Sequence, residues 1–335
     1  MNRKHVLKTM VLACLMALCS MPMSAQGSAQ RGDLNGDGGV TIADVTMLID
    51  NLMGGGDMTA IRTVADFNQD GDVTIADVTA MIDYLLTGEM PVKPYEPVIE
   101  TFTVSGVTFD MLLVEGGTFT MGAIEGDPYV RPWESPTHEV TVSDYYIGVT
   151  EVTQALWTAV MGSNPSWFTS TNGYATDLQR PVERVTYSNC LAFIMKLNMK
   201  TGKTFRLLTE AEWEFAARGG NWSKGTIYAG SDNVEDVAWH NGNSGEIPHA
   251  VGTKAPNELG LYDMSGNMGE WTSDWYGLYT TDAQVDPKGP ESGTARVVRG
   301  GSWGQAFRMG RVTSRTEGWP DSPIIHVGLR LAMSR

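Results

Sequence analysis

The chain has 335 residues, with 39 acidic and 24 basic side chains, a formal net charge of −15 and an isoelectric point near 4.7. This length is sufficient for a core domain and one smaller module. Such an acidic chain is repelled by nucleic acid and by anionic membrane surfaces, so neither is an expected partner. The composition favours a soluble protein that binds cations.

The first residues predict an export signal. Three basic residues precede an apolar run over 10–18, and the small residue Ala25 follows. These are the three parts of a secretory signal peptide over 1–25, and the apolar run is too short to favour a membrane anchor. We therefore expect an exported protein without a membrane span, which is secreted, held at the cell surface or periplasmic.

The cysteines are few. Cys14 and Cys19 lie inside the expected signal, where lipid attachment is a second interpretation of the pattern. Removal of the signal would change the formal charge from −15 to −18 and leave Cys190 alone, so no internal disulfide is expected. A lone cysteine is most simply a small buried apolar side chain.

Two copies of an acidic loop, 33 residues apart, form an internal repeat. Loop 1 covers 33–44 and loop 2 covers 66–77. Calcium takes about six to eight oxygen ligands in a flexible shell, and loop positions one, three, five, seven and twelve supply them. The expected ligands are Asp33, Asn35, Asp37, the carbonyl of Gly39 and Asp44 in loop 1, and Asp66, Asn68, Asp70, the carbonyl of Asp72 and Asp77 in loop 2.

An amphipathic helix is expected after each loop. Apolar residues at helical spacing define one face of each, namely Ile42, Val45, Leu48, Ile49 and Leu52 in the first copy and Ile75, Val78, Met81, Ile82 and Leu85 in the second. Because each stripe alone would be exposed, we expect the two to pack together. Residues 31–90 hold eleven acids and two basic residues, so carboxylate repulsion predicts a calcium-dependent fold.

The two loops and their helices resemble a dockerin module, which we place at 31–88. Position twelve is Asp, as in that family, where an EF-hand usually has Glu. The resemblance implies a cohesin-like scaffold protein as partner, selected in part by loop positions ten and eleven. These are Ile42-Ala43 and Ile75-Ala76, where the family often has hydroxyl residues. The alternative is that the module packs on its own chain as a stabilising appendage.

A proline-containing linker is expected over 89–106, followed by a second domain over 107–335. Short strand patterns, long loops and few helices predict an α+β domain. A strand is expected near 109–114, and helices are expected over 151–161 and 188–199. A further helix should follow Thr209, because Glu212 stands three residues later and completes a capping box.

This second domain carries a series of motifs. In order they are Gly116–Gly122, Glu151–Thr153, Arg206–Glu214, Gly260–Met264, Gly266–Trp271, Arg299–Trp303 and Gly328–Arg330. The set resembles the formylglycine-generating enzyme, or sulfatase-modifying factor, family. The resemblance implies a variant C-type-lectin-like fold. It also implies the oxidation of a substrate cysteine to formylglycine, with copper held by two cysteines.

The copper ligands are missing from the expected place. Copper(I) requires soft thiolate ligands, which the resemblance places shortly after the Gly-Gly-Ser motif. Residues 300–311 contain no cysteine, and Cys190 is distant in sequence. Gly269 stands where the family has a pocket tryptophan, although Ser302 keeps its pocket serine. We therefore expect neither copper nor an iron site, because the histidines also lack ligand spacing.

The resemblance also implies a third, structural calcium site. Asp263 and Glu270 would supply carboxylates, and Gly266 and Met268 would supply carbonyls. Asp263 replaces a more usual asparagine, which is also an oxygen ligand. The role of this site would be stability rather than catalysis.

The leading hypothesis is an exported attachment and recognition protein, with a dockerin-like tether and a non-catalytic second domain. Its ligand, a protein or a carbohydrate, would bind C-terminal loops that contain Phe307, Met309, Trp319 and Ile324. One alternative is an oxidoreductase with an altered metal site, which the missing cysteine pair opposes. Another is a loop-variable binder, since some lectin-like relatives vary just before a terminal Gly-Phe-Arg.

Overall fold

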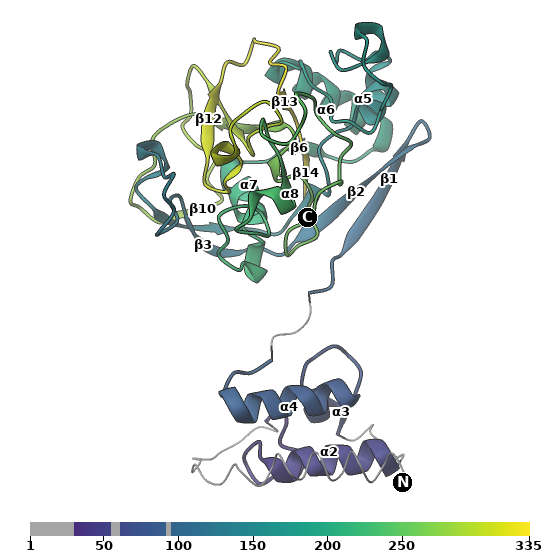
Figure 1. Ribbon diagram of the computed structural model, residues 1–335, viewed down its shortest axis with the longest axis vertical. Coiled ribbons are helices and arrows are strands. Elements are labelled where there is room, and N and C mark those ends of the chain that lie inside the picture. Colours follow the sequence, from purple (N-terminus) through teal and green to yellow (C-terminus); the bar gives the residue numbers. More distant parts are fainter. Residues whose placement is uncertain (1–29, 55–60, 92–94) are drawn as a thin grey trace. The chain divides into compact units, whose positions relative to one another are not determined.

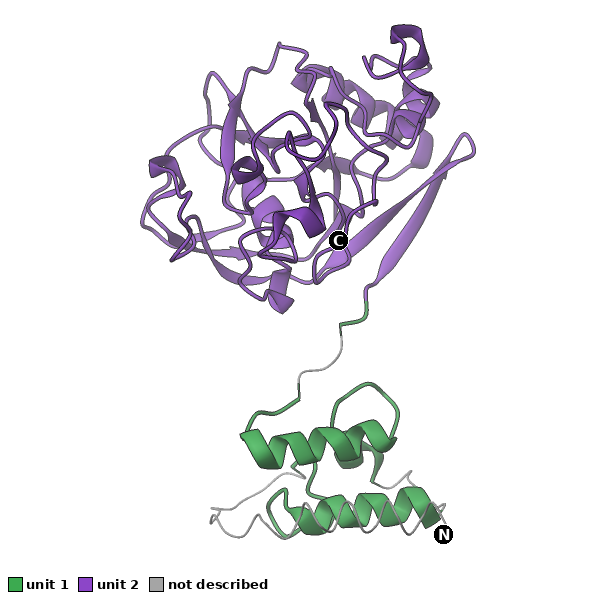
Figure 2. Ribbon diagram, viewed as in Figure 1, with its two compact units in different colours: residues 1–96 green, residues 97–335 purple. Residues whose placement is uncertain are grey.

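A computed structural model describes residues 30–54, 61–91 and 95–335, so the expected signal peptide over 1–25 lies outside the described residues. The chain divides into two compact units, residues 1–96 (unit 1) and 97–335 (unit 2) (Figure 2). Among the described residues, no helix has the length and apolar character needed to cross a bilayer.

Unit 1 is helical in its described part. Its helices are α2 (Ile42–Gly54), α3 (Arg62–Ala65) and α4 (Ile75–Thr87) (Figure 1). The expected apolar stripes meet in one core, where Val45, Leu48, Val78 and Met81 are at most 3% exposed. Ile75 differs from the expectation, because it is 59% exposed at the start of α4.

Unit 2 begins inside the segment predicted as a linker. Strand β1 (Ile99–Val104) pairs antiparallel with β2 (Val107–Val114) through a two-residue turn at Ser105 and Gly106. Both turn residues have positive φ, 50° and 83°, which is the hairpin geometry that glycine favours. The stretch 99–104 is therefore a strand rather than linker, because alternate residues of β1 turn inward and pack on the core.

The largest sheet of unit 2 has five strands in the order β1-β2-β5-β14-β6. Its other members are β5 (Tyr145–Gly148), β6 (Phe205–Leu207) and β14 (Leu331–Ser334). The last strand, β14, thus pairs with both β5 and β6. Helices α5 (Gln154–Met161) and α6 (Tyr187–Thr201) contact each other and this sheet, and they contribute to the same apolar core.

Three smaller sheets complete unit 2. They have the orders β10-β4-β3, β12-β11-β9-β13 and β7-β8. Their strands are β3 (Gly117–Met121), β4 (His138–Val142), β7 (Ala238–Trp239), β8 (Ser265–Gly266), β9 (Gly269–Trp275), β10 (Gln284–Val285), β11 (Arg296–Arg299), β12 (Arg315–Gly318) and β13 (Val327–Gly328). The helices α7 (Glu210–Ala217) and α8 (Val234–Val237) and short 3-10 turns lie between them. This mixture confirms the α+β class.

The helix starts follow from side-chain capping. Thr209 and Glu212 form the expected box: the Thr209 hydroxyl accepts from the Glu212 amide, and the Glu212 carboxylate accepts from the Thr209 amide at 2.9 Å. Helix α5 begins at Gln154, three residues later than expected, because Thr153 is its N-cap. Glu151 is thereby left in the preceding loop.

Buried arginine–carboxylate pairs hold the long loops of unit 2. Arg299 contacts Glu214, and Arg330 contacts Glu270. Arg311 donates to Glu134 at 2.6 Å, across 177 residues of sequence. Such pairs join segments that are distant in the chain. They hold loops in place in regions of unit 2 that have few helices and strands.

Candidate functional site

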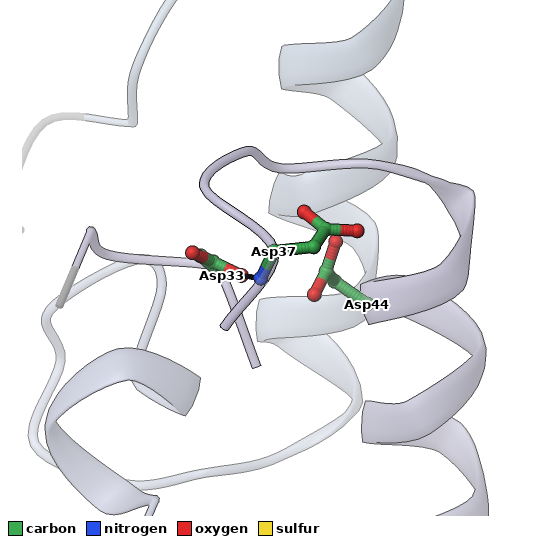
Figure 3. A group of neighbouring side chains, drawn as sticks. All are labelled: Asp33, Asp37 and Asp44. Atoms are coloured by element: carbon green, nitrogen blue, oxygen red, sulfur yellow. Dashed lines mark hydrogen bonds between the residues drawn. The ribbon is translucent and has the colours of Figure 1, made fainter. Parts of the chain in front are cut away.

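Loop 1 gathers three carboxylates. Asp33, Asp37 and Asp44 each offer a ligand oxygen, and these oxygens lie within 4.8 Å of one another (Figure 3). Within the described ranges this is the only such group of three or more His, Cys, Asp or Glu side chains. The three acidic residues predicted for loop 1 thus lie close together.

The backbone of loop 1 holds these carboxylates in place. Asp33 accepts from the amides of residues 36–38 at 2.8–3.1 Å. Asp44 is fully buried and accepts from the amides of Leu34 and Thr41. Gly38 has a φ of +98°, which permits the turn at position six. The donor set, all oxygen and mostly anionic, fits calcium.

Loop 2 repeats the amide-to-carboxylate bonds of loop 1, although its carboxylates do not form a cluster as close as that of Asp33, Asp37 and Asp44. Asp77 is buried and accepts from the amides of Phe67 and Asn68 at 2.7 and 3.1 Å. Asp66 accepts from Gly71 through Oδ2, whereas its Oδ1 is buried and has no protein donor. A buried carboxylate oxygen without a donor is costly, and a bound cation would satisfy it. Loop 2 therefore also fits calcium.

The predicted third calcium site has a different environment. Glu270 accepts from Arg330 at 2.7–3.1 Å and from the Trp213 indole at 2.7 Å. Asp263 accepts from the Gly252 amide through Oδ2. Since Glu270 already has a cationic partner in Arg330, a metal here would compete with that pair. The site at Asp263, Gly266, Met268 and Glu270 stays a prediction.

Glu151 is a buried acid that sequence reasoning missed. It is 2% exposed, and neither carboxylate oxygen has a hydrogen-bond donor among the described groups. Burial, and then the charge of Asp263, raise the pKa of Glu151 well above its usual range. Burial also raises the pKa of Asp263 to about 6. The Glu-Val-Thr motif contained this residue, but the pattern gave no sign that it faces Asp263.

The segment after the Gly-Gly-Ser turn does not fit a copper–thiolate site. Ser302 is 2% exposed and donates to Gln305 Oε1 at 3.2 Å, and residues 300–311 hold no cysteine. Cys190 is fully buried within the apolar core on α6. Burial raises the pKa of its thiol, which disfavours a thiolate.

A cavity of about 540 Å³ lies beside this turn. Trp303, the residue after Ser302, lines it with Trp167, Phe168 and Tyr174, so we call it the aromatic cavity. Asn241, Glu246 and His326 supply polar side chains to its wall. Sequence reasoning missed it, because its walls come from four loops that are distant in sequence. None of the four residues predicted for recognition, Phe307, Met309, Trp319 and Ile324, is among the described lining residues.

Comparison with known families settles the class of unit 2. The sulfatase-modifying factor enzyme 1-like domain matches residues 96–335. The chain belongs to this family. A dockerin type I domain matches residues 31–86, so the predicted order of a dockerin module followed by a sulfatase-modifying-factor-like domain is confirmed.

Relatives of this sulfatase-modifying-factor-like chain carry several names. The chaperone protein LppX of Paenibacillus barcinonensis is 36% identical over 248 residues, covering 59% of this chain and 79% of the relative. The formylglycine-generating enzyme of Thermomonospora curvata is 30% identical over 289 residues, covering 66% and 92%.

Solved structures agree on the fold of the sulfatase-modifying-factor-like unit. Treponema denticola variable protein 1 is 34% identical with a TM-score of 0.64, covering 72% of this chain and all of the other. PvdO from Pseudomonas aeruginosa, at 24% identity and a TM-score of 0.58, shows a similar fold over the same share. The expected lectin-like architecture thus holds for unit 2.

Proposed function

We propose that this chain is an exported attachment and recognition protein, in which a calcium-loaded dockerin module tethers a non-catalytic sulfatase-modifying-factor-like domain. The observation that carries this proposal is the chemistry of residues 300–311, which offer no thiolate for copper. Cys190 supplies no substitute, because it is enclosed in the core. The fold then remains as a scaffold for loops, and loops are suited to recognition.

Attachment rests on unit 1. Loops 1 and 2 would each hold one calcium ion through the ten predicted ligands. The carboxylate cluster of loop 1 and the amide-bound Asp44 and Asp77 of the two loops support this assignment. A cohesin-like scaffold protein is the proposed partner of residues 31–88. Export by the signal over 1–25 would place the module outside the cytoplasm, where calcium is abundant.

The names of the relatives are compatible with a role in binding. One relative is named a chaperone, and one solved structure is named a variable protein. The relative from Thermomonospora curvata is named for the oxidation reaction, so family membership alone does not decide the activity. The missing cysteine pair in residues 300–311 of this chain supports the non-catalytic alternative.

The test is a mass-spectrometric assay on the purified mature protein. The protein is incubated with copper, calcium, oxygen and a sulfatase-type cysteine peptide. The mass of the peptide then shows whether its cysteine has been converted to the formylglycine aldehyde. We expect no conversion while the Thermomonospora curvata enzyme converts the same peptide in parallel. Conversion by this chain would overturn the proposal and require a metal site built without a cysteine pair.

A further inference from the structure

We propose that the aromatic cavity of unit 2 binds a neutral carbohydrate. This inference rests on the proposed recognition function and specifies its ligand class. The cavity volume of about 540 Å³ falls within the range of about 300–1,000 Å³ that is usual for small-molecule sites. The argument uses the shape of the aromatic wall, its supports, its polar groups and its charge.

The aromatic wall offers flat apolar surface at defined angles. Phe168 is 2% exposed and packs edge to face with Tyr174 at 4.8 Å and with Trp303 at 5.1 Å. Trp167 is 41% exposed, a large fraction for a residue of this kind inside a folded domain. Aromatic rings that lie partly in water bind the C–H face of a sugar ring well, because that face is apolar while its hydroxyl edge stays wet.

A buried acid holds this wall in place before any ligand arrives. Glu183 is fully buried and accepts from the backbone amides of Trp167 and Phe168 at 2.5 and 3.1 Å. The Ser166 hydroxyl in turn accepts from the Glu183 amide. Because the loop is already ordered, less conformational entropy is lost when a ligand binds.

The polar groups of the cavity match hydroxyls. Burial lowers the pKa of His326, so its ring is neutral at pH 7 and has one donor and one acceptor. Asn241 and Glu246 add an amide and a carboxylate at the wall. Sugar hydroxyls both donate and accept, so they can satisfy this mixed set.

The charge of the cavity opposes an anionic ligand. Among the described residues that line it, none is lysine or arginine, and Glu246 is acidic. Arg184 lies 5.5 Å from the centre of the Trp167 ring but is not among the residues that line the cavity. The negative charge of a sulfated or uronic glycan would therefore find no positive side chain in the lining. A neutral glycan needs no such partner.

The test measures binding of the full mature chain to polysaccharides by affinity electrophoresis and by tryptophan fluorescence titration. The neutral probes are xylan, mannan and mixed-linkage β-glucan with their hexasaccharides, and the charged probes are polygalacturonate and chondroitin sulfate. We expect retention by at least one neutral probe and none by the charged probes. Chelation of calcium should leave this binding unchanged, because no predicted calcium ligand lines the cavity.

Matched variants locate the site. Trp167→Ala should weaken binding by about tenfold or more, since it removes one stacking surface. Tyr174→Leu provides a second substitution in the same wall. Trp133→Ala is the control, because Trp133 is 39% exposed, close to the exposure of Trp167, and lies outside the lining. Thermal melting of each variant checks that its fold is intact.

Three outcomes would overturn the inference: binding to charged probes alone, binding to no neutral probe at millimolar concentration, or equal loss in the Trp167 and Trp133 variants. These outcomes are separate from those of the peptide assay. A chain that binds a neutral glycan and also converts the cysteine peptide would refute the proposed function and keep the carbohydrate site. A chain that does neither would refute the carbohydrate site alone.

Discussion

Single buried arginines fix the long loops of unit 2, and Arg299 is a clear case. Its guanidinium donates to the Glu214 carboxylate and to the carbonyls of residues 312–314 at 2.7–3.1 Å. Arg299→Met would leave these buried acceptors unpaired, so we expect the free energy of unfolding to fall by about 3–5 kcal/mol in urea denaturation. Arg335→Met is the control, because that side chain is 61% exposed, and its effect should stay within about 0.5 kcal/mol.

At the same scale, each calcium loop depends on its first aspartate. Asp33→Ala and Asp66→Ala should each remove one of the two proposed calcium ions. Each variant loses a predicted calcium ligand, and it also loses the carboxylate that accepts hydrogen bonds from the loop amides. Calorimetric titration measures the number of sites. Asp83→Ala removes the same charge from an exposed position on α4 and should keep both sites. Two intact sites in either loop variant would refute the assignment.

The sequence indicates the proposed calcium ligands, whereas it gave no sign of the aromatic cavity. A calcium loop is local, so Asp33 and Asp44 are recognisable by their spacing along twelve residues. The cavity joins Trp167 to Trp303, which are 136 positions apart, and no periodicity connects them. Glu183 was also missed, because its hydrogen bonds with Trp167 and Phe168, 16 and 15 positions away, follow no periodic pattern.

At the scale of elements, the start of α7 carries a pH-sensitive contact. Asp274 on β9 accepts from the amide of Glu210, the first residue of α7, at 3.0 Å. Burial, and then the negative charge of Glu210, raise the pKa of Asp274 to about 7. The folded chain therefore binds this proton more tightly than the unfolded chain, and the associated stability is lost as the pH rises from about 4 through about 7.

The expected result is a pH-dependent difference between wild type and Asp274→Asn. The variant keeps an oxygen acceptor but cannot ionise, so its stability relative to wild type should increase between pH 5 and pH 8. Chemical denaturation across that range gives the free energies of unfolding. The exposed Asp282→Asn is the control and should give a constant difference. A constant difference for Asp274→Asn as well would contradict the raised pKa.

Element boundaries show where pattern reading succeeded and where it failed. The box at Thr209 and Glu212 located α7 correctly, because capping depends on neighbours in sequence. Strand β1 was read as linker, because nearby prolines outweighed the short inward alternation of Phe102 and Val104. Residues 99–104 form a strand because they pair with β2. The sequence indicates this pairing only when the hairpin turn between the two strands is recognised.

At the scale of the whole molecule, the two units should respond separately to calcium. We expect unit 1 to require cations that offset the charge of its acidic loops, whereas the core of unit 2 is built from apolar contacts and internal ion pairs. Chelation should therefore abolish the helical circular dichroism of residues 31–88 and leave the near-ultraviolet tryptophan signal of unit 2. The same titration on residues 97–335 alone should change little. Loss of the tryptophan signal at the same chelator concentration would contradict independent units.

The position of β14 also has a consequence for how unit 2 folds. Residues 331–334 pair with β5 on one side and β6 on the other, across about 125 to 190 positions of sequence. A chain without these residues has a gap between β5 and β6, so the five-stranded sheet cannot close without them. Because pairing between residues so distant in sequence is slow, we expect the closing of this sheet to limit the folding rate of unit 2.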